Sequence, residues 1–253
     1  MQSQEPPFGG LLPSTKRKGQ TLICKIANLG VDVPELGDLS RRCKPYETDV
    51  PVDITLDAAQ IRPDVVKTLP AEDNYYLVSG AQFYQQLLRY DGMMLHASAV
   101  VVDGYAYLFS GPCGMGKSTH TAMYKNSWPD AVIINDDKPA LRRIDGTWHV
   151  FGTPWCGKDG INVNTSALLG GICFLHRGDT LLRRITPLEA LPQFLKQTGG
   201  RKNAQDAKLL MGLLDDLLRN VPIFDFFNHA ALGDEQITYQ AMREAIGRKE
   251  KTL

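Results

Sequence analysis

The sequence predicts a mixed α/β fold, and the segment from residue 95 to residue 135 carries this prediction. Residues 95–102 and 105–110 are rich in β-forming side chains, and Asp103-Gly104 between them is a strong hairpin signal. A glycine-rich loop follows the second run directly, and a helical segment and a short apolar run come after the loop. The order strand, glycine loop, helix and strand is typical of a phosphate-binding P-loop.

The sequence of the first third of the chain predicts an α+β extension that precedes the P-loop segment. Residues 21–27 and 50–56 show the apolar alternation of strands, and residues 81–90 are typical of a short helix. No motif in this part indicates a chemistry. We therefore expect an N-terminal extension at 1–90 and a P-loop domain at 91–253.

Beyond the P-loop helix, the sequence predicts two strands, an irregular loop and C-terminal helices. Residues 131–135 and 171–175 are compact apolar runs typical of buried strands, whereas residues 148–160 hold too many Gly, Pro and Trp for a regular element. Residues 186–189 read Thr-Pro-Leu-Glu, a capping box with proline at the first helical position. Leucines between residues 209 and 218 recur at helical spacing, and we expect this stripe to face the core rather than a partner.

The composition indicates an ordinary globular protein of 253 residues, with 28 basic and 28 acidic side chains. This balance gives no overall attraction to nucleic acid or to an anionic membrane, and we expect neither as a partner. The five cysteines are scattered and never form a Cys-x-x-Cys pair, which argues against a disulfide framework and a zinc site. No apolar run reaches the roughly 18 residues of a membrane span. The first 20 residues lack the apolar core of a secretory signal, and we expect them to be mobile and the protein to be cytoplasmic.

The P-loop reads Gly111-Pro112-Cys113-Gly114-Met115-Gly116-Lys117-Ser118. Its glycines let the backbone curl so that N–H groups point at a polyphosphate, and the positive end of the following helix adds to the attraction. We expect Lys117 to reach the β- and γ-phosphates of ATP and the Ser118 hydroxyl to bind Mg²⁺. The residues expected to bind ATP are Gly111, Cys113, Gly114, Met115, Gly116, Lys117, Ser118 and Thr119.

Two adjacent carboxylates, Asp136 and Asp137, follow the strand predicted after the P-loop helix. They stand at the edge at which open α/β sheets bind ligands. We expect one to hold the metal and the other to accept a proton from a substrate hydroxyl. Position in the motif favours Asp136 as the base and Asp137 as the metal ligand. The alternative is that one of the two only caps the loop.

Two further side chains are candidates for a catalytic role. His96 lies on the hairpin strand whose partner leads into the P-loop, although a lone strand histidine is more often a satisfied core residue. Lys158 lies in a glycine-flanked loop that could bring a second cation to the transferring phosphoryl group. Its alternative is an ordinary solvated lysine.

These segments together resemble the catalytic domain of HPr kinase/phosphorylase, a family related to phosphoenolpyruvate carboxykinases. The resemblance runs from His96 through the hairpin and the P-loop to Asp137. It implies an HPr kinase / phosphoenolpyruvate carboxykinase-like P-loop fold with a mixed sheet and C-terminal helices. It also implies that a phosphoryl group is transferred to a serine hydroxyl, that His96 partners the catalytic carboxylate, and that Asp136 and Asp137 are the base and metal pair.

The sequence departs from that family in two respects. The Glu-x-Arg-Gly-x-Gly segment that supplies a metal carboxylate and an arginine is absent, and residues 151–158 occupy the comparable place. Lys158 is a candidate substitute for the arginine, and nothing replaces the glutamate. The first third does not resemble the regulatory domain, so HPr itself is not the expected substrate.

A closer similarity is to short HPr-kinase-like proteins that share three motifs. The motifs His-Ala-Ser-Ala-Val, Asn-Asp-Asp-Lys-Pro and Gly-Thr-Pro-Trp-x-Gly-Lys stand here at 96–100, 135–139 and 152–158. Some members are similar to kinases that modify ribosomally made peptides. We therefore expect an ATP- and Mg²⁺-dependent kinase that acts on a hydroxyl of a peptide, small protein or small molecule. A nucleotide-sensing protein without catalysis and a carboxykinase-like enzyme for a small acid are the alternatives, and homo-oligomerisation is left open.

Overall fold

The computed structural model describes residues 21–250. The mobility expected of the first 20 residues lies outside this described part. The strands are β1 (Thr21–Ile26), β2 (Leu29–Pro34), β3 (Ile54–Thr55), β4 (Gly92–Met94), β5 (Ala97–Val102), β6 (Tyr105–Ser110), β7 (Val132–Asn135), β8 (Ala140–Ile144), β9 (Thr147–Phe151), β10 (Ser166–Arg177), β11 (Leu181–Arg184) and β12 (Ile223–Asn228). The α-helices are α1 (Gly37–Cys43), α2 (Ala71–Leu87), α3 (Lys117–Ser127), α4 (Pro187–Gln197), α5 (Ala204–Asn220) and α6 (Asp234–Glu250), and two 3₁₀ turns span Lys44–Tyr46 and Leu88–Tyr90.

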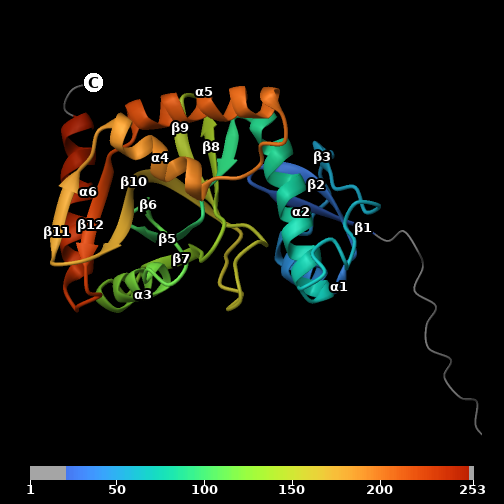
Figure 1. Cartoon of the computed structure of the whole chain (residues 1–253), viewed down its shortest axis with the longest axis horizontal. Helices are drawn as coiled ribbons and strands as arrows, with labels where there is room; N and C mark the ends of the chain where they lie inside the picture. The colour runs from blue at the N-terminus through green and yellow to red at the C-terminus, as the bar shows by residue number, and fades with distance from the viewer. Residues whose placement is uncertain (1–20, 251–253) are drawn as a thin grey trace, which may run out of the picture.

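A nine-stranded sheet with helices on both faces forms the body of the molecule (Figure 1). Its path runs β4-β8-β9-β10-β6-β5-β7, and β12 pairs with β10 and carries β11 beyond it. Parallel and antiparallel pairs are both present, so the predicted mixed α/β class is confirmed. Helices α4 and α5 cover one face of this sheet, and α3 and α6 pack on the other.

The hairpin predicted before the P-loop is present as β5 and β6. Its two turn residues, Asp103 and Gly104, have φ angles of 50° and 78°, as a two-residue turn with both central residues left-handed requires. Strand β6 pairs parallel to β10, and β7 pairs antiparallel to β5. Because β5 is also antiparallel to β6, the carboxyl ends of β6, β7 and β10 meet at one edge of the sheet. This edge receives the P-loop, the aspartate pair and Arg177.

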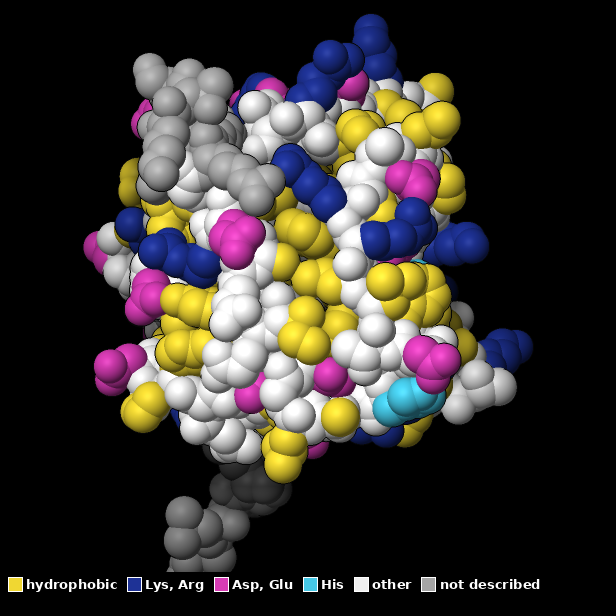
Figure 2. Space-filling view, turned by 90° about the vertical axis from the view of Figure 1, so that its left-hand side faces the viewer, with side chains coloured by type: hydrophobic (Ala, Val, Ile, Leu, Met, Phe, Trp, Pro, Cys, Tyr) yellow, Lys and Arg dark blue, Asp and Glu magenta, His cyan; other side chains and the backbone are white. Residues whose placement is uncertain are grey.

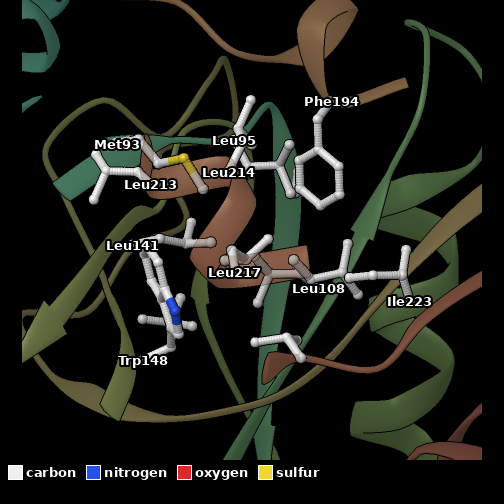
Figure 3. Close-up of a cluster of buried hydrophobic side chains, with 14 of the residues drawn as sticks. Met93, Leu95, Leu108, Leu141, Trp148, Phe194, Leu213, Leu214, Leu217 and Ile223 are labelled. Atoms are coloured by element: carbon white, nitrogen blue, oxygen red, sulfur yellow. The ribbon is translucent and has the colours of Figure 1, made fainter. Parts of the chain in front are cut away.

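The core under α4 and α5 confirms the prediction that the leucine stripe is buried. Leu210, Leu213, Leu214 and Leu217 of α5 are at most 6% exposed. Figure 3 shows three of them packed with Phe194 of α4 and with Leu108 and other side chains of the sheet. The predicted capping box is also present at the start of α4, where the side chains of Thr186 and Glu189 each bond the other residue's backbone.

The N-terminal part packs beside the large sheet rather than apart from it (Figure 1). Strands β1, β2 and β3 form a three-stranded sheet, and α1 and α2 lie against it. Their buried side chains share one cluster with Ala140, Phe151 and Trp155 of the P-loop part. Trp155 stacks on Phe83 of α2 with ring centroids 4.7 Å apart. The junction between the two parts is therefore itself a hydrophobic core.

Four predicted elements differ in the structure. The strand expected at 50–56 is reduced to β3, which spans only Ile54–Thr55. Residues 148–160 were expected to be irregular, but their start is strand β9, in which Trp148 and Val150 are buried and His149 is less so. Helix α2 begins at Ala71, ten residues before the predicted start, because tertiary packing rather than local propensity holds its first turns. The run 131–135 forms β7 at an edge of the sheet, where Val132 is 38% exposed, so it is not the buried strand expected.

Two surface properties bear on the classes of function. Among the described residues, no helix is both long and apolar enough to cross a membrane. Figure 2 shows the face that carries α6 and β11, where hydrophobic, basic and acidic side chains are interspersed and neither charge gathers into one patch. All five cysteines lie in the described part and are free thiols.

Candidate functional site

The loop after β6 has the backbone curl that a P-loop needs. Gly111, Gly114 and Gly116 have φ angles of 150°, 79° and 93°, a region that side chains with a Cβ rarely adopt. A Cβ at Gly114 or Gly116 would meet nothing within 4 Å, so backbone conformation rather than packing requires glycine there. The space over the loop is thus open, as the approach of a phosphate group would require.

Lys117 begins α3 and folds back onto its own loop. Its Nζ donates to the carbonyl oxygens of Gly111 at 2.9 Å and Pro112 at 3.2 Å. The residue is 8% exposed, and burial lowers the pKa of its ammonium group. The next residues of the first helical turn, Ser118 and Thr119, are exposed. The ammonium group and the helix N-terminus are thereby held beside the open loop.

Asp136 faces the P-loop helix through a hydroxyl chain. Ser98 of β5 donates its hydroxyl to Asp136 Oδ1 at 2.6 Å, and its oxygen lies 2.7 Å from the hydroxyl of Thr121, one turn into α3. Ser98 and Thr121 are both fully buried. The charge of Asp136 also acts on Lys117. This carboxylate is therefore fixed on the side of the sheet edge that carries α3.

Asp137 is held by three side chains from outside α3. Lys138 Nζ and the Tyr76 hydroxyl both donate to its Oδ2, and His96 Nε2 lies 3.3 Å from its Oδ1. Burial, and then the charge of Asp137, raises the pKa of the Tyr76 hydroxyl, so Tyr76 remains a donor. The Asp137 charge also acts on Lys117. Asp137 thus lies between the P-loop lysine and the side chains of α2.

His96 joins Asp137 to the end of α4. Its Nδ1 is 3.0 Å from Gln197 Oε1, and its backbone N–H donates to the Gln197 carbonyl at 2.8 Å. Burial, followed by the charge of Lys117, lowers the pKa of the ring, which favours the neutral form at neutral pH. A neutral ring can donate only one N–H, so the donor to Asp137 depends on the tautomer.

Asn135 fixes the backbone that carries the two aspartates. Its Oδ1 accepts the N–H groups of Asp137 at 2.9 Å and Lys138 at 2.7 Å, and its Nδ2 donates to the Thr153 carbonyl at 3.1 Å. Gly152 lets the two segments come this close, because a Cβ there would lie 2.5 Å from the Ile134 carbonyl oxygen. The aspartate turn and the loop after β9 therefore form one rigid unit.

Lys158 lies in this loop after β9 and is exposed. No hydrogen bond or ion pair of its ammonium group is found within residues 21–250. It lines a cavity of about 300 Å³ that Asp137 and Gly157 also line. The structure therefore brings Lys158 to the same cavity as Asp137.

Five side chains at this edge received no role from the sequence: Arg42, Tyr76, Lys138, Arg177 and Gln197. Arg177, at the end of β10, donates from Nη2 to the Gly114 carbonyl at 3.0 Å, and the predicted strand at 171–175 could have pointed to it. Lys138 stands inside the Asn-Asp-Asp-Lys-Pro motif. Tyr76 is 61 residues from Asp137 in the chain, and no local pattern signals such a contact.

The donors present fit a magnesium ion that is held mainly by nucleotide phosphates. Such an ion takes one or two protein oxygens and keeps its other positions for phosphate and water. Asp136, which accepts a hydrogen bond from Ser98 at one oxygen, and the exposed hydroxyl of Ser118 are the oxygen donors beside the P-loop. No group of three or more His, Cys, Asp or Glu side chains suited to a metal occurs in the described part of the chain.

Comparison with known proteins gives a distant likeness of fold. No family model matches the chain, and no curated protein matches it. Among solved structures, the chain is similar to the HPr(Ser) kinase/phosphatase from Coxiella burnetii, with 15% sequence identity and a TM-score of 0.38. The match covers 63% of this chain and 93% of that chain. A likeness this distant does not fix an activity.

Proposed function

We propose that this protein is an ATP- and Mg²⁺-dependent kinase that transfers the γ-phosphoryl group to a hydroxyl, a serine of a peptide or small protein. The observation that carries the proposal is the position of Asp137. This carboxylate lies near the P-loop lysine and also lines an open cavity, so one group can reach both a nucleotide and an acceptor. A protein that only binds ATP has no use for such a cavity at its second carboxylate.

The P-loop residues would bind the phosphates. The backbone N–H groups of residues 113–119, the positive end of α3 and the Lys117 ammonium group all attract negative charge. Lys117 exchanges its two carbonyl partners for phosphate oxygens when ATP binds. Bound Mg²⁺ would neutralise charge on the phosphates. Arg177, beside Gly114, adds a cation from β10.

We propose that Asp136 binds the metal and Asp137 is the base, the reverse of the division that position in the motif favours. Asp136 is held on the α3 side by Ser98, whereas Asp137 lines the cavity. Asp137 accepts the proton of the acceptor hydroxyl while the hydroxyl oxygen bonds to the γ-phosphorus, and the bond from that phosphorus to the bridging oxygen of ADP breaks. His96 and Tyr76 orient the carboxylate. Lys158 would balance the charge of the phosphoryl group in transfer.

The Asp136→Asn and Asp137→Asn variants test this division of roles. Asp136→Asn should weaken Mg-ATP binding in calorimetry. Asp137→Asn should bind Mg-ATP normally and slow transfer from γ-labelled ATP to a pooled library of serine peptides by roughly 10²–10⁴-fold. Asp130→Asn, an exposed site between α3 and β7, is the control for loss of one charge. Full transfer in both variants would refute catalysis by this pair, whereas a wild type that binds Mg-ATP but transfers nothing would support a nucleotide-sensing protein.

A further inference from the structure

The cavity beside Asp137 is built largely by the N-terminal part of the chain. Helices α1 and α2 form its walls, and the loop that holds Gly157 and Lys158 closes it beside Asp137. Its volume of about 300 Å³ is at the small end of ligand pockets. It therefore has room for a small group or for one or two residues of a peptide. Nothing in the nucleotide-binding scheme occupies it.

The walls of the cavity are mainly apolar. Leu39 of α1, Leu69 before α2, and Tyr76 and Leu77 of α2 line it. Leu77 is 41% exposed, so an apolar side chain that enters would remove its surface from water. A small hydroxyl compound without an apolar group would make no apolar contacts with these walls. The cavity suits a hydroxyl group that is carried next to an apolar group.

The cavity holds charged side chains of both signs. Near Asp137 lie Lys138, which is ion-paired with it, and Lys158. Arg42 is ion-paired with Asp38 at 2.7 Å, and its Nη1 donates to the Gly157 carbonyl at 2.6 Å.

Two exposed carboxylates of α2 also face the cavity. Glu72 and Asp73 also line the cavity, about one helical turn before Tyr76 on α2, a distance of roughly 5 Å along the axis. Within the described residues, the one hydrogen bond found for the Glu72 carboxylate comes from the backbone N–H of Asp38, at 2.8 Å. A ligand that places a hydroxyl at Asp137 thus meets negative charge one or two residues further along.

We propose, on the basis of the kinase function above, that this cavity binds the acceptor serine of a peptide. In this peptide an apolar residue adjoins the serine, and a Lys or Arg lies one or two positions away. The serine hydroxyl approaches Asp137, the apolar neighbour packs on Leu39, Leu69 and Leu77, and the basic side chain pairs with Glu72 and Asp73. The N-terminal part of the chain is then the acceptor-binding part of the enzyme.

A positional library of serine peptides tests the proposal with the full-length protein, Mg²⁺ and γ-labelled ATP. Peptides with Leu beside the serine and Lys one or two positions away should be phosphorylated about three- to tenfold more efficiently, in kcat/KM, than matched peptides with Glu in place of Lys. Binding of Mg-ATP by the same preparation, measured by calorimetry, is tested separately. If Mg-ATP does not bind, the proposed function itself fails.

Variants of Asp73 link any preference to the cavity. Asp73→Lys should abolish or reverse the preference for Lys over Glu, while Asp73→Asn, which is less disturbing to the first turn of α2, should reduce it. Asp130→Lys makes the same charge change outside the cavity and should keep the wild-type preference. Mg-ATP affinity reports that each variant is folded.

Three results would overturn the inference while leaving ATP binding intact. One is that no peptide of the library is phosphorylated by a protein that binds Mg-ATP. Another is that free hydroxyl compounds are phosphorylated and peptides are not. The third is a peptide preference that is indifferent to neighbouring Leu and Lys, or that survives Asp73→Lys unchanged.

Discussion

Lys117 has two backbone carbonyls as its partners, and its ammonium group is almost out of contact with water. A buried ammonium group is costly unless polar atoms surround it, so the loop has to hold the lysine when no phosphate is bound. Burial lowers its pKa, while the neighbouring Asp136 and Asp137 act in the opposite direction. An incoming phosphate would supply stronger, charge-assisted partners than the carbonyls.

Lys117→Ala should therefore weaken Mg-ATP binding by a factor on the order of 10²–10⁴, because about two charge-assisted hydrogen bonds of roughly 1.5–3 kcal/mol each are lost. Calorimetric titration with Mg-ATP measures the effect. Lys125→Ala, in the last turn of the same helix, removes a lysine far from the loop and should bind like wild type. Equal affinities for wild type and Lys117→Ala would mean that this loop does not bind the phosphates.

At the scale of residues, the sequence singled out the candidate site residues but not the side chains that contact them. His96, Asp136, Asp137 and Lys117 were all singled out, because each stands in or beside a motif with its own local pattern. Tyr76 could not be found in this way, because its contact with Asp137 depends on how α2 packs across the sheet edge.

Helix α3 links the P-loop to a buried histidine at its first turn. His120 is 1% exposed, its Nε2 lies 3.0 Å from the Thr238 hydroxyl of α6, and its ring packs 4.3 Å from that of Phe109. Burial lowers the pKa of His120 to about 4, against a slight opposing effect of Glu235. The histidine is therefore neutral in the folded protein at neutral pH and has a structural role.

Lowering the pH should destabilise the folded protein through His120. Its pKa in the folded state is below the unfolded value near 6.5, so the unfolded chain binds the proton first as the pH falls. The contribution of neutral His120 to the free energy of unfolding is fully present above about pH 6.5. It is lost as the pH falls toward 4, and the total loss is roughly 3 kcal/mol.

Urea unfolding at about pH 7, 6 and 5 should therefore show a smaller decline in the free energy of unfolding for His120→Gln than for wild type. Gln keeps a donor for Thr238 but does not titrate. His229→Gln removes an exposed histidine and should retain the wild-type decline. If the free energy of unfolding falls equally with pH in wild type and in His120→Gln, groups other than His120 cause the acid sensitivity.

The elements that the sequence predicted correctly are those with a strong local signal. Asp103-Gly104 fixes the hairpin turn, and Thr186 with Glu189 fixes the start of α4. The start of α2 and strand β9 were missed, because their stability comes from contacts with distant parts of the chain. Trp148 of β9, for example, donates its indole N–H to Asp216 of α5 at 2.8 Å.

Across the whole molecule, the two parts of the chain are joined through Trp155. This side chain is fully buried, stacks on Phe83, and donates its indole N–H to the Ser79 hydroxyl at 3.0 Å. Gly80 allows α2 to lie this close, because a Cβ there would be 3.0 Å from the indole ring. The same loop carries Gly157 and Lys158, so the packing at Trp155 also sets the shape of the cavity beside Asp137.

Trp155→Ala should reduce the free energy of unfolding by about 3–5 kcal/mol, because it removes a large buried ring and leaves a void in a core that both parts share. Since the core is shared, wild type should unfold in urea as one transition, with circular dichroism and fluorescence coinciding. Urea titrations of the two proteins measure both quantities.

Trp128→Ala is the matched control for this junction. Trp128 packs on Tyr124 and Tyr239, within the P-loop part, and is only half-buried, so its removal should cost less and leave the junction intact. Two separate transitions in wild type, with Trp155→Ala shifting only the weaker one, would contradict the shared core. Such a result would instead support independent folding units that meet near the predicted boundary at residue 90, and the cavity beside Asp137 would then lie between units able to open.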